Sequence, residues 1–207
     1  KFEKFLRIPY DEAIDKYGTD KPDLRYDMTL VDITNECKDS GVNIFKEVEA
    51  VKGILVDKKF SKSEIESLTK DMKLEGAKGM LWFVVENGRL GGSMAKLFDE
   101  KIQKSILKSF EKAGYDIHDG QYIFAFGDVY TKACKLAGIL RSKMGDVLNL
   151  KDPNILAFAW IVDFPMFEWD EKNKKWDFGH NPFSMPKGGL KTLEAAETDE
   201  QKLAIVA

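Results

Sequence analysis

Apolar residues recur every three or four positions in the middle of the chain, which is the spacing of one helix face. Ser61 and Glu64 form a capping-box sequence, and the helix that they start is predicted to end at Gly76. A second helix is predicted over residues 99–114. A third follows Asp128, whose carboxylate can cap it. Its apolar stripe is typical of a buried helix face: Val129, Ala133, Leu136, Ala137, Leu140, Met144, Val147 and Leu148.

The segments between these helices are rich in β-branched and aromatic residues and predict an antiparallel sheet. Residues 44–50 and 51–57 follow each other closely and are expected to form adjacent strands. Residues 80–85 are apolar throughout, and residues 121–126 supply a further strand. The apolar faces of three helices can cover one face of such a sheet. We therefore expect residues 42–149 to form a two-layer α+β unit.

Two shorter helical patterns, over residues 10–17 and 30–37, precede this unit and are joined by the polar sequence TDKPDLR. Its proline disfavours helical backbone at the residue before it. The charged residues Asp20, Asp23 and Arg25 can bond the loop's own backbone or an external group. The residues alone favour a structural turn, and a binding function stays open.

The region from Ile161 to Pro186 reads IVDFPMFEWDEKNKKWDFGHNPFSMP, in which two aromatic-rich runs flank a polar tip. This pattern predicts a β-hairpin whose return strand carries His180 and Asn181 at its end. Strands made this way usually wall a pocket, and their aromatic side chains are expected to pack against a sheet. Glu168 and Asp170 could be read as a carboxylate pair for acid–base chemistry, but the lysines beside them favour solvated surface charges.

The two ends of the sequence suggest a piece of a longer protein. Residues 156–167 are apolar nearly throughout, as in a central strand of a larger sheet whose other strands lie elsewhere. The chain does not begin with methionine, and it stops inside an apolar helical pattern. We expect an excised fragment.

Composition limits the possible partners. The 207 residues are 43% hydrophobic and contain no apolar run of about 18 residues, so no membrane partner is expected. The net charge of -3 excludes a surface that is basic all over, as a general nucleic-acid binder would have. Any RNA contact must be local. The best candidates are Lys132, Lys135, Arg141 and Lys143 in one helical segment, although a solvated helix face is the expected state.

Few residues suggest reactive chemistry. Cys37 and Cys134 lie in apolar helical patterns and are expected to be buried thiols. Together with His118 and His180 they lack the spacing of metal ligands, so no metal site is predicted. The sequence ENGRLGGS lacks the order of a phosphate-binding loop and predicts a flexible turn. Sparse cysteines and the absence of a signal peptide favour a cytoplasmic protein.

Several segments resemble the middle of bacterial aspartyl-tRNA synthetases, which are class II enzymes. RIPYDEAIDKYGTDKPDLR resembles the segment after class II motif 2, and WIVDFPMFEWDE with HNPFSMP resembles the return into the catalytic sheet. GAKGMLWFVVENGRLGGSMAKLF and LAGILRSKMGDVLNL resemble the inserted GAD domain. The resemblance implies a catalytic-domain segment over residues 1–41, a GAD domain with a DCoH-like α/β fold over residues 42–149, and a return into the antiparallel catalytic sheet over residues 150–207.

The same resemblance implies a function for the complete protein. A cytoplasmic homodimer would activate aspartate with ATP and Mg²⁺ and transfer it to tRNA. Class II motifs 1, 2 and 3 have no match in this sequence. The ATP site and the arginines that clamp its phosphates are therefore expected to lie in other parts of the complete enzyme. We therefore predict no catalytic residue and no cofactor site in the chain itself, and no activity from it alone.

One substrate contact is carried over by resemblance. His180 matches the first histidine of the family's HHPFT-like motif, and an imidazole can donate a hydrogen bond to the carboxylate of aspartate. Asn181 stands where many relatives have a second histidine, and it keeps amide donors but cannot gain a proton charge. Asn181 and Phe164 are expected to support the pocket.

Two other functions compete with this interpretation. GAD domains also occur in subunits of tRNA-dependent amidotransferases, and residues 42–149 could act only as a docking surface for RNA or protein. YGTDKPDLR and the DFPMF…HNPF frame favour the synthetase, because an amidotransferase would not need these flanking segments.

Overall fold

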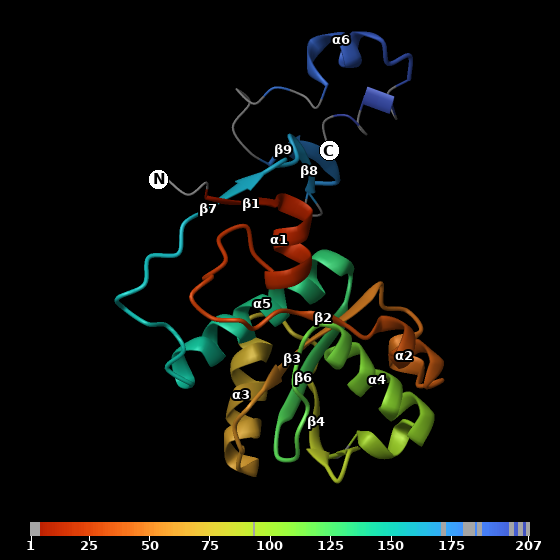
Figure 1. Ribbon diagram of the computed structural model, residues 1–207. Coiled ribbons are helices and arrows are strands. Elements are labelled where there is room, and N and C mark those ends of the chain that lie inside the picture. The colour runs from red at the N-terminus through yellow and green to blue at the C-terminus, as the bar shows by residue number, and fades with distance from the viewer. Residues whose placement is uncertain are drawn as a thin grey trace. The chain divides into compact units, whose positions relative to one another are not determined.

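A computed structural model describes residues 5–92, 94–170, 173–179, 185, 188–198, 201–202 and 205 (Figure 1). Its contacts divide the chain into two compact units. The central unit is Glu12–Phe158, and the terminal unit combines Lys1–Asp11 with Ala159–Ala207. The first helix, α1 (Tyr10–Tyr17), runs from the terminal unit into the central one. These contact boundaries differ from the expected segment boundaries at residues 42 and 149, because the chain before residue 42 contributes to the central core.

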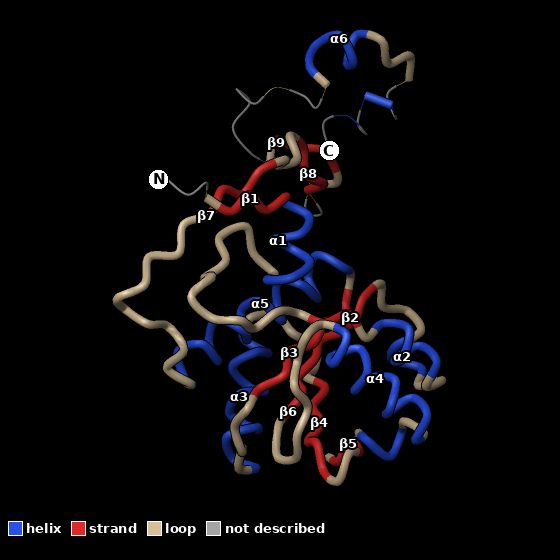
Figure 2. The backbone as a smooth tube through the Cα atoms, viewed as in Figure 1, coloured by secondary structure: helices blue, strands red, loops and turns tan. Residues whose placement is uncertain are grey.

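The described strands of the central unit form one antiparallel sheet (Figure 2). Its five strands follow the order β2, β3, β6, β4, β5. The middle pair is the longest, with Ala50 opposite Asp128 at one end and Val56 opposite Tyr122 at the other. The strand bounds are β2 (Val31–Asp32), β3 (Ala50–Val56), β4 (Leu81–Glu86), β5 (Arg89–Gly91) and β6 (Tyr122–Asp128).

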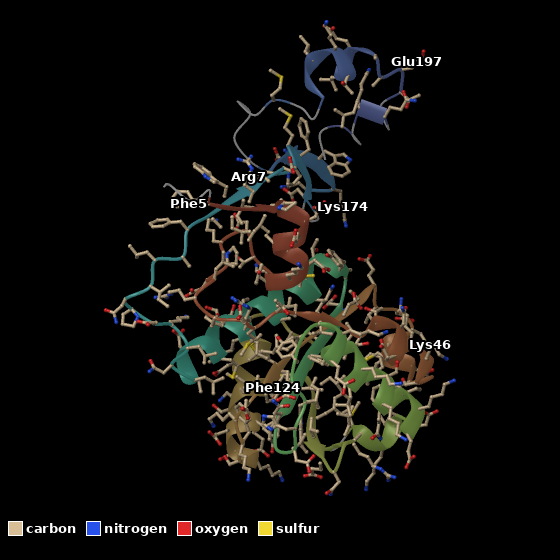
Figure 3. The ribbon with its side chains drawn as sticks, in the orientation of Figure 1. Phe5, Arg7, Lys46, Phe124, Lys174 and Glu197 are labelled. Carbon is tan, nitrogen blue, oxygen red and sulfur yellow. The ribbon has the colours of Figure 1, made fainter. Side chains whose placement is uncertain are left out.

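Helices pack on both faces of this sheet, so the expectation that helices cover one face of a two-layer unit is wrong (Figure 1). α2 (Thr34–Asp39) and α4 (Glu100–Lys112) lie over one face, and α3 (Lys62–Leu74) and α5 (Tyr130–Val147) lie over the other. Side chains alternate across each strand, and the middle strands β3 and β6 have buried side chains on both faces of the sheet. Phe124, labelled in Figure 3, is fully buried on the α3 and α5 side.

Most helix ends follow the predicted signals. Ser61 and Glu64 make the reciprocal bonds of a capping box at the start of α3. Asp99 accepts a hydrogen bond from the Ile102 N–H at 2.8 Å and caps α4. Asp128 does not cap α5, because its carboxylate accepts the Val129 N–H and lies 3.0 Å from the Lys132 ammonium instead. The α+β prediction with an antiparallel sheet is confirmed.

The predicted strand over residues 44–50 is wrong. Asn43–Phe45 forms the short 3-10 helix η1, and a second one, η2, spans Ala95–Leu97. β2 pairs with β3 on the side away from β6, with Val31 opposite Gly53 and Asp32 opposite Lys52, so the predicted partner strand of β3 is replaced there by β2. The helical pattern over residues 30–37 was likewise assigned too broadly, since its first part is β2.

The turn at Asn87 and Gly88 requires left-handed backbone, and the Asn-Gly sequence predicts it. Asn87 and Gly88 have φ of 51° and 69° in the turn that joins β4 to β5. Two left-handed residues make the two-residue hairpin turn that asparagine followed by glycine favours. The ENGRLGGS segment therefore turns a hairpin.

The terminal unit contains two separate strand pairs. β1 (Leu6–Pro9) pairs in parallel with β7 (Ala159–Val162), and β8 (Phe167–Asp170) pairs in antiparallel register with β9 (Lys175–Phe178). The second pair confirms the predicted hairpin. A short helix, α6 (Gly189–Glu194), follows. Only part of the expected strand over residues 156–167 is regular. In the part of the chain that the structure describes, no helix has the length and apolar character needed to cross a bilayer.

Candidate functional site

The residue predicted to contact substrate, His180, and its neighbour Asn181 lie outside the described residues. The hairpin is described up to the residue before them. Phe167 lies opposite Phe178, and the Gly179 N–H donates to the Met166 carbonyl at 3.2 Å, which extends the pairing past β9. The described hairpin therefore ends at Gly179, the residue before His180 in the sequence.

Phe164, the third predicted site residue, is described and half-buried. It lies between β7 and β8, and its ring centroid is 5.1 Å from that of Tyr10 at an interplanar angle of 47°. This is a favourable tilted aromatic contact. Phe164 thus joins the segment after β7 to the start of α1 within the terminal unit, which agrees with the packing role expected for the aromatic residues of this run.

Asp170, for which a solvated surface charge was favoured over a catalytic carboxylate pair with Glu168, has a structural role. Asp170 accepts hydrogen bonds from the backbone N–H of Asn173 at 3.0 Å and from its side-chain amide at 2.6 Å. These bonds stabilise the turn between β8 and β9, as aspartate commonly does. Asp170 is therefore occupied in turn formation.

In the central unit, a buried arginine holds the TDKPDLR loop. Its role was not predicted from the sequence. Arg141 of α5 is 2% exposed. Its guanidinium donates to the backbone carbonyls of Met28, Asp23 and Tyr26, the last two at 2.8 and 3.3 Å. The rings of Tyr17 and Tyr26 lie 5.0 and 4.2 Å from its central carbon. The loop is thus fixed by charge-assisted hydrogen bonds and cation–π contacts.

The loop also bonds itself. Arg25 donates to both carboxylate oxygens of Asp23, at 2.9 and 2.7 Å, and to the Asp152 carbonyl at 3.3 Å. The side-chain bond from Arg25 is the main reason why the pKa of Asp23 is lowered from 3.8 to about 2. Lys21 extends outward, with its side chain 84% exposed. The structural role expected for Asp23 and Arg25 is confirmed.

A close backbone contact sets where the loop begins. Gly18 has φ of 69°, and a Cβ atom on it would lie 2.1 Å from the Cys134 carbonyl oxygen and 2.7 Å from the Gly138 Cα atom. A Cβ atom on Gly138 would in turn lie 2.7 Å from the Tyr17 carbonyl oxygen. Only glycine at both positions allows this approach between the end of α1 and the middle of α5.

Beside this contact lies an ionic cluster that the sequence analysis missed. Lys52, in the middle of β3, is 2% exposed, and its ammonium lies 2.5 Å from Asp15 and 3.0 Å from Asp32. Burial alone would lower the pKa of Lys52, but hydrogen bonds to the two carboxylates outweigh burial and raise it. Tyr130 donates to Asp15 at 2.9 Å. The available signal was a lysine inside an apolar strand, because a buried ammonium requires a partner of opposite charge.

The basic residues predicted on α5 do not form a free cationic surface. Arg141 is buried, Lys132 pairs with Asp128, and Lys143 pairs with Asp71. Among the described residues, Lys135 is the member of this group that makes no ion pair. The geometry therefore does not support the RNA contact that was considered for this helix, and the favoured solvated face is wrong for Arg141, which is buried.

The described residues offer no reactive centre of a familiar type. Cys37 and Cys134 are buried, as predicted, and burial raises the pKa of their thiols to about 12 and about 11. Over the described ranges, no three His, Cys, Asp or Glu side chains are arranged to hold a metal ion. The residues around the TDKPDLR loop can position a backbone segment, but they lack a nucleophile with a lowered pKa.

Comparisons with known proteins place the chain in a family. A family model described as tRNA synthetases class II (D, K and N) matches residues 1–205. An aspartate–tRNA(Asp/Asn) ligase of Hydrogenobaculum sp. (strain Y04AAS1) is 39% identical over 187 residues, which cover 88% of this chain and 31% of that protein. Ligases of the same description from Wolbachia sp. subsp. Drosophila simulans (strain wRi) and Rickettsia felis are 40% and 38% identical, each over 98% of this chain and 34% of the relative. The chain thus spans about a third of the length of the relatives that it matches. It belongs to the class II tRNA synthetases of the D, K and N group.

Proposed function

We propose that the chain is part of an aspartate–tRNA ligase, which activates aspartate with ATP and transfers it to tRNA. The match over 98% of the chain at 40% identity to a ligase of that description carries this proposal. The chain supplies about a third of such an enzyme, so the activity belongs to the full-length protein. The alternatives, an amidotransferase subunit and a docking module without catalysis, gain no support from these relatives.

Each part of the chain has a place in this proposal. Residues 1–41 would follow motif 2, residues 42–149 would form the GAD insertion with a DCoH-like fold, and residues 150–207 would return to the catalytic sheet. The antiparallel strands β3 to β6 and helices α3 and α4, all inside residues 42–149, support an inserted α/β domain. The early strand β2 adds to the same sheet from outside those bounds.

His180 is proposed to donate a hydrogen bond to the side-chain carboxylate of aspartate. The hairpin β8–β9 supports this by carrying the chain to the position before His180. A protonated imidazole would favour the negative ligand further. Asn181 would contribute amide donors but no charge. Phe164 would support the pocket by its contact with Tyr10.

ATP, Mg²⁺ and tRNA complete the proposed enzyme. The described residues contain no cluster of three His, Cys, Asp or Glu side chains that could hold a metal ion by itself. ATP and Mg²⁺ are proposed to bind residues of the full-length enzyme beyond this segment. A cytoplasmic homodimer is the proposed form of the complete enzyme.

The test is aspartate- and ATP-dependent pyrophosphate exchange by the full-length enzyme. We expect His180→Ala to weaken the use of aspartate roughly ten- to hundredfold, because it removes a hydrogen bond to a charged group worth ~1.5–3 kcal/mol. ATP dependence should change far less. The matched control is His118→Ala, since His118 is a half-exposed histidine of the central unit and lies 3.4 Å from Asp57.

Three results would contradict the proposal. Exchange that depends on another amino acid would exclude aspartate as the substrate. Unchanged aspartate dependence in His180→Ala would exclude the contact. An equal loss for both substrates with a lowered melting temperature would give His180 a structural role. The isolated 207-residue chain should show no exchange.

A further inference from the structure

Helix α4 carries a row of lysines along its exposed side. Lys101, Lys104, Lys108 and Lys112 are all exposed. With about 100° of rotation per residue, the four side chains lie within an arc of about 80°, and the row extends for about 16 Å along the helix axis. The opposite side of α4 holds Ile106 and Phe110, which are fully buried in the core. We name Lys101, Lys104, Lys108 and Lys112 the α4 lysine row.

These lysines are not neutralised by neighbouring carboxylates. Over the described residues, none of the four makes an ion pair or a side-chain hydrogen bond. Glu100 of the same helix is taken by Arg89, whose guanidinium lies 2.8 Å away. Glu36 of α2, which packs beside α4, accepts the hydroxyl of Ser109 at 2.6 Å. Glu111 is the remaining exposed acid of α4, and it lies at the edge of the row.

Helix α3 provides a comparison, because its exposed side carries charges of both signs. It has the same length as α4 and also carries several exposed lysines. Its acids are interspersed among them and pair with lysines: Glu64 with Lys58 at 2.5 Å, Glu66 with Lys62 at 3.9 Å, and Asp71 with Lys143. The α4 lysine row is therefore a local concentration of positive charge on a chain whose net charge is -3.

We propose that the α4 lysine row is a docking surface for the phosphate backbone of RNA. Lysines act as point charges toward phosphates, and a straight row of them suits a linear polyanion. This inference rests on the proposed function, which supplies the RNA in the form of tRNA. The contact adds affinity without reading sequence, because phosphates carry no sequence information directly.

The experiment compares two triple variants of the full-length enzyme that remove the same charge. Lys104→Gln/Lys108→Gln/Lys112→Gln neutralises most of the row. Lys62→Gln/Lys70→Gln/Lys73→Gln is the control, because these three lysines are exposed on α3. The probe is an aspartate tRNA transcript, and its dissociation constant is measured at several salt concentrations. Aspartate-dependent pyrophosphate exchange without tRNA checks the proposed function separately.

We expect the α4 variant to bind the transcript about tenfold more weakly at low salt. The slope of log Kd against the logarithm of the salt concentration should fall by about one for each lost phosphate contact. The α3 control should bind as the unchanged enzyme does, and both should retain exchange. A variant with arginine at the same three α4 positions keeps the charge and should restore binding.

Equally weakened tRNA binding in both glutamine variants would overturn the proposal, because binding would then depend on the net charge of the protein and not on the α4 lysine row. Unchanged binding in the α4 variant, or no binding of the transcript by the unchanged enzyme, would also overturn it. Absence of exchange in the unchanged enzyme would instead count against the proposed function. If the triple α4 variant melts early, Lys104→Gln/Lys108→Gln alone should give a smaller loss of binding in the same direction.

Discussion

Arg141 is a buried charge whose described hydrogen-bond partners are carbonyl oxygens and a tyrosine hydroxyl in place of a carboxylate. Burial is the first cause that lowers its pKa, yet a guanidinium stays protonated in proteins. Each carbonyl that it satisfies belongs to a loop without regular secondary structure. The side chain therefore supplies the hydrogen bonds that a strand or helix would otherwise give to this loop.

The Asp23 carboxylate gives the same loop a defined response to acid. Its pKa in the folded chain is about 2, against 3.8 as the ordinary value, mainly because of the hydrogen bond from Arg25. A lowered pKa means that the stabilisation is fully present above the unfolded pKa and is lost as pH falls through the folded one. The pH window is therefore from about 4 down to about 2.

We expect the stability difference between the unchanged chain and Asp23→Asn to be constant from neutral pH to about pH 4 and to shrink below it. The measurement is the midpoint of urea unfolding at a series of pH values. Arg25→Gln should show the same narrowing, because it removes the partner. A stability difference that is as large at pH 2 as at neutral pH would show that Arg25 does not lower the pKa of the Asp23 carboxyl.

At the scale of elements, α1 and α5 meet through their backbones at Gly18 and Gly138. Alanine usually stabilises the interior of a helix relative to glycine by roughly 0.5–1 kcal/mol. At Gly138 we expect the opposite sign. A Cβ atom there would meet the Tyr17 carbonyl oxygen at 2.7 Å and the Gly18 Cα atom at 2.8 Å, and backbone atoms cannot move aside as a flexible side chain would.

Gly138→Ala should therefore lower the free energy of unfolding by about 1–3 kcal/mol, the usual range for overpacking. The matched control is Lys135→Ala, an exposed position of the same helix, which should change stability by less than about 0.5 kcal/mol. Urea unfolding of the 207-residue chain measures both. A stabilising Gly138→Ala would show that the two backbones do not approach this closely.

The elements that sequence reasoning found are those with local signals. The capping residues Ser61 and Asp99 and the glycine ends of α3 and α4 act within one turn of chain, so they can be read without the fold. β2 is two residues long and has no period to detect. Residues 44–50 have strand composition, but β2 already holds the edge of β3. Tertiary competition of this kind is invisible in one segment.

Candidate site residues divide in the same way. Phe164 makes an aromatic contact with Tyr10, as the packing expected for aromatic runs suggests, and its support of a pocket stays a prediction. The anchors Arg141 and Lys52 were missed because their partners lie far away in sequence. Arg141 was instead grouped with surface cations, since position on a helix does not reveal what approaches from another segment. His180 rests on resemblance, and its contact stays a proposal.

For the whole molecule, the extent of the central core decides which piece folds alone. Tyr26, Met28 and Leu30 are buried in one core cluster, and Val31 and Ile33 in the other. All five precede residue 42. A unit that begins at residue 42 would expose the surfaces that these side chains cover and would leave the edge of β3 unpaired.

We expect residues 12–158 expressed alone to unfold in one cooperative transition, because they contain both clusters. Residues 42–149 alone should melt at a clearly lower temperature or without cooperativity. Calorimetry of the two fragments gives the comparison. Equal melting temperatures would mean that the segment before residue 42 contributes little to the core.

The central strand pair β3–β6 also determines how the molecule can be reached from the unfolded chain. Its two strands are far apart in sequence, with α3, β4, β5, η2 and α4 between them. The loop between the two strands must close before the strands can pair, so this pairing is expected to be the slow step of folding. Ile123→Val in β6 should then slow refolding, whereas Ile65→Val in α3 should mainly change unfolding. Stopped-flow experiments measure the refolding and unfolding rates of both variants. Equal effects of the two variants on the refolding rate would show that pairing of β3 with β6 is not the slow step.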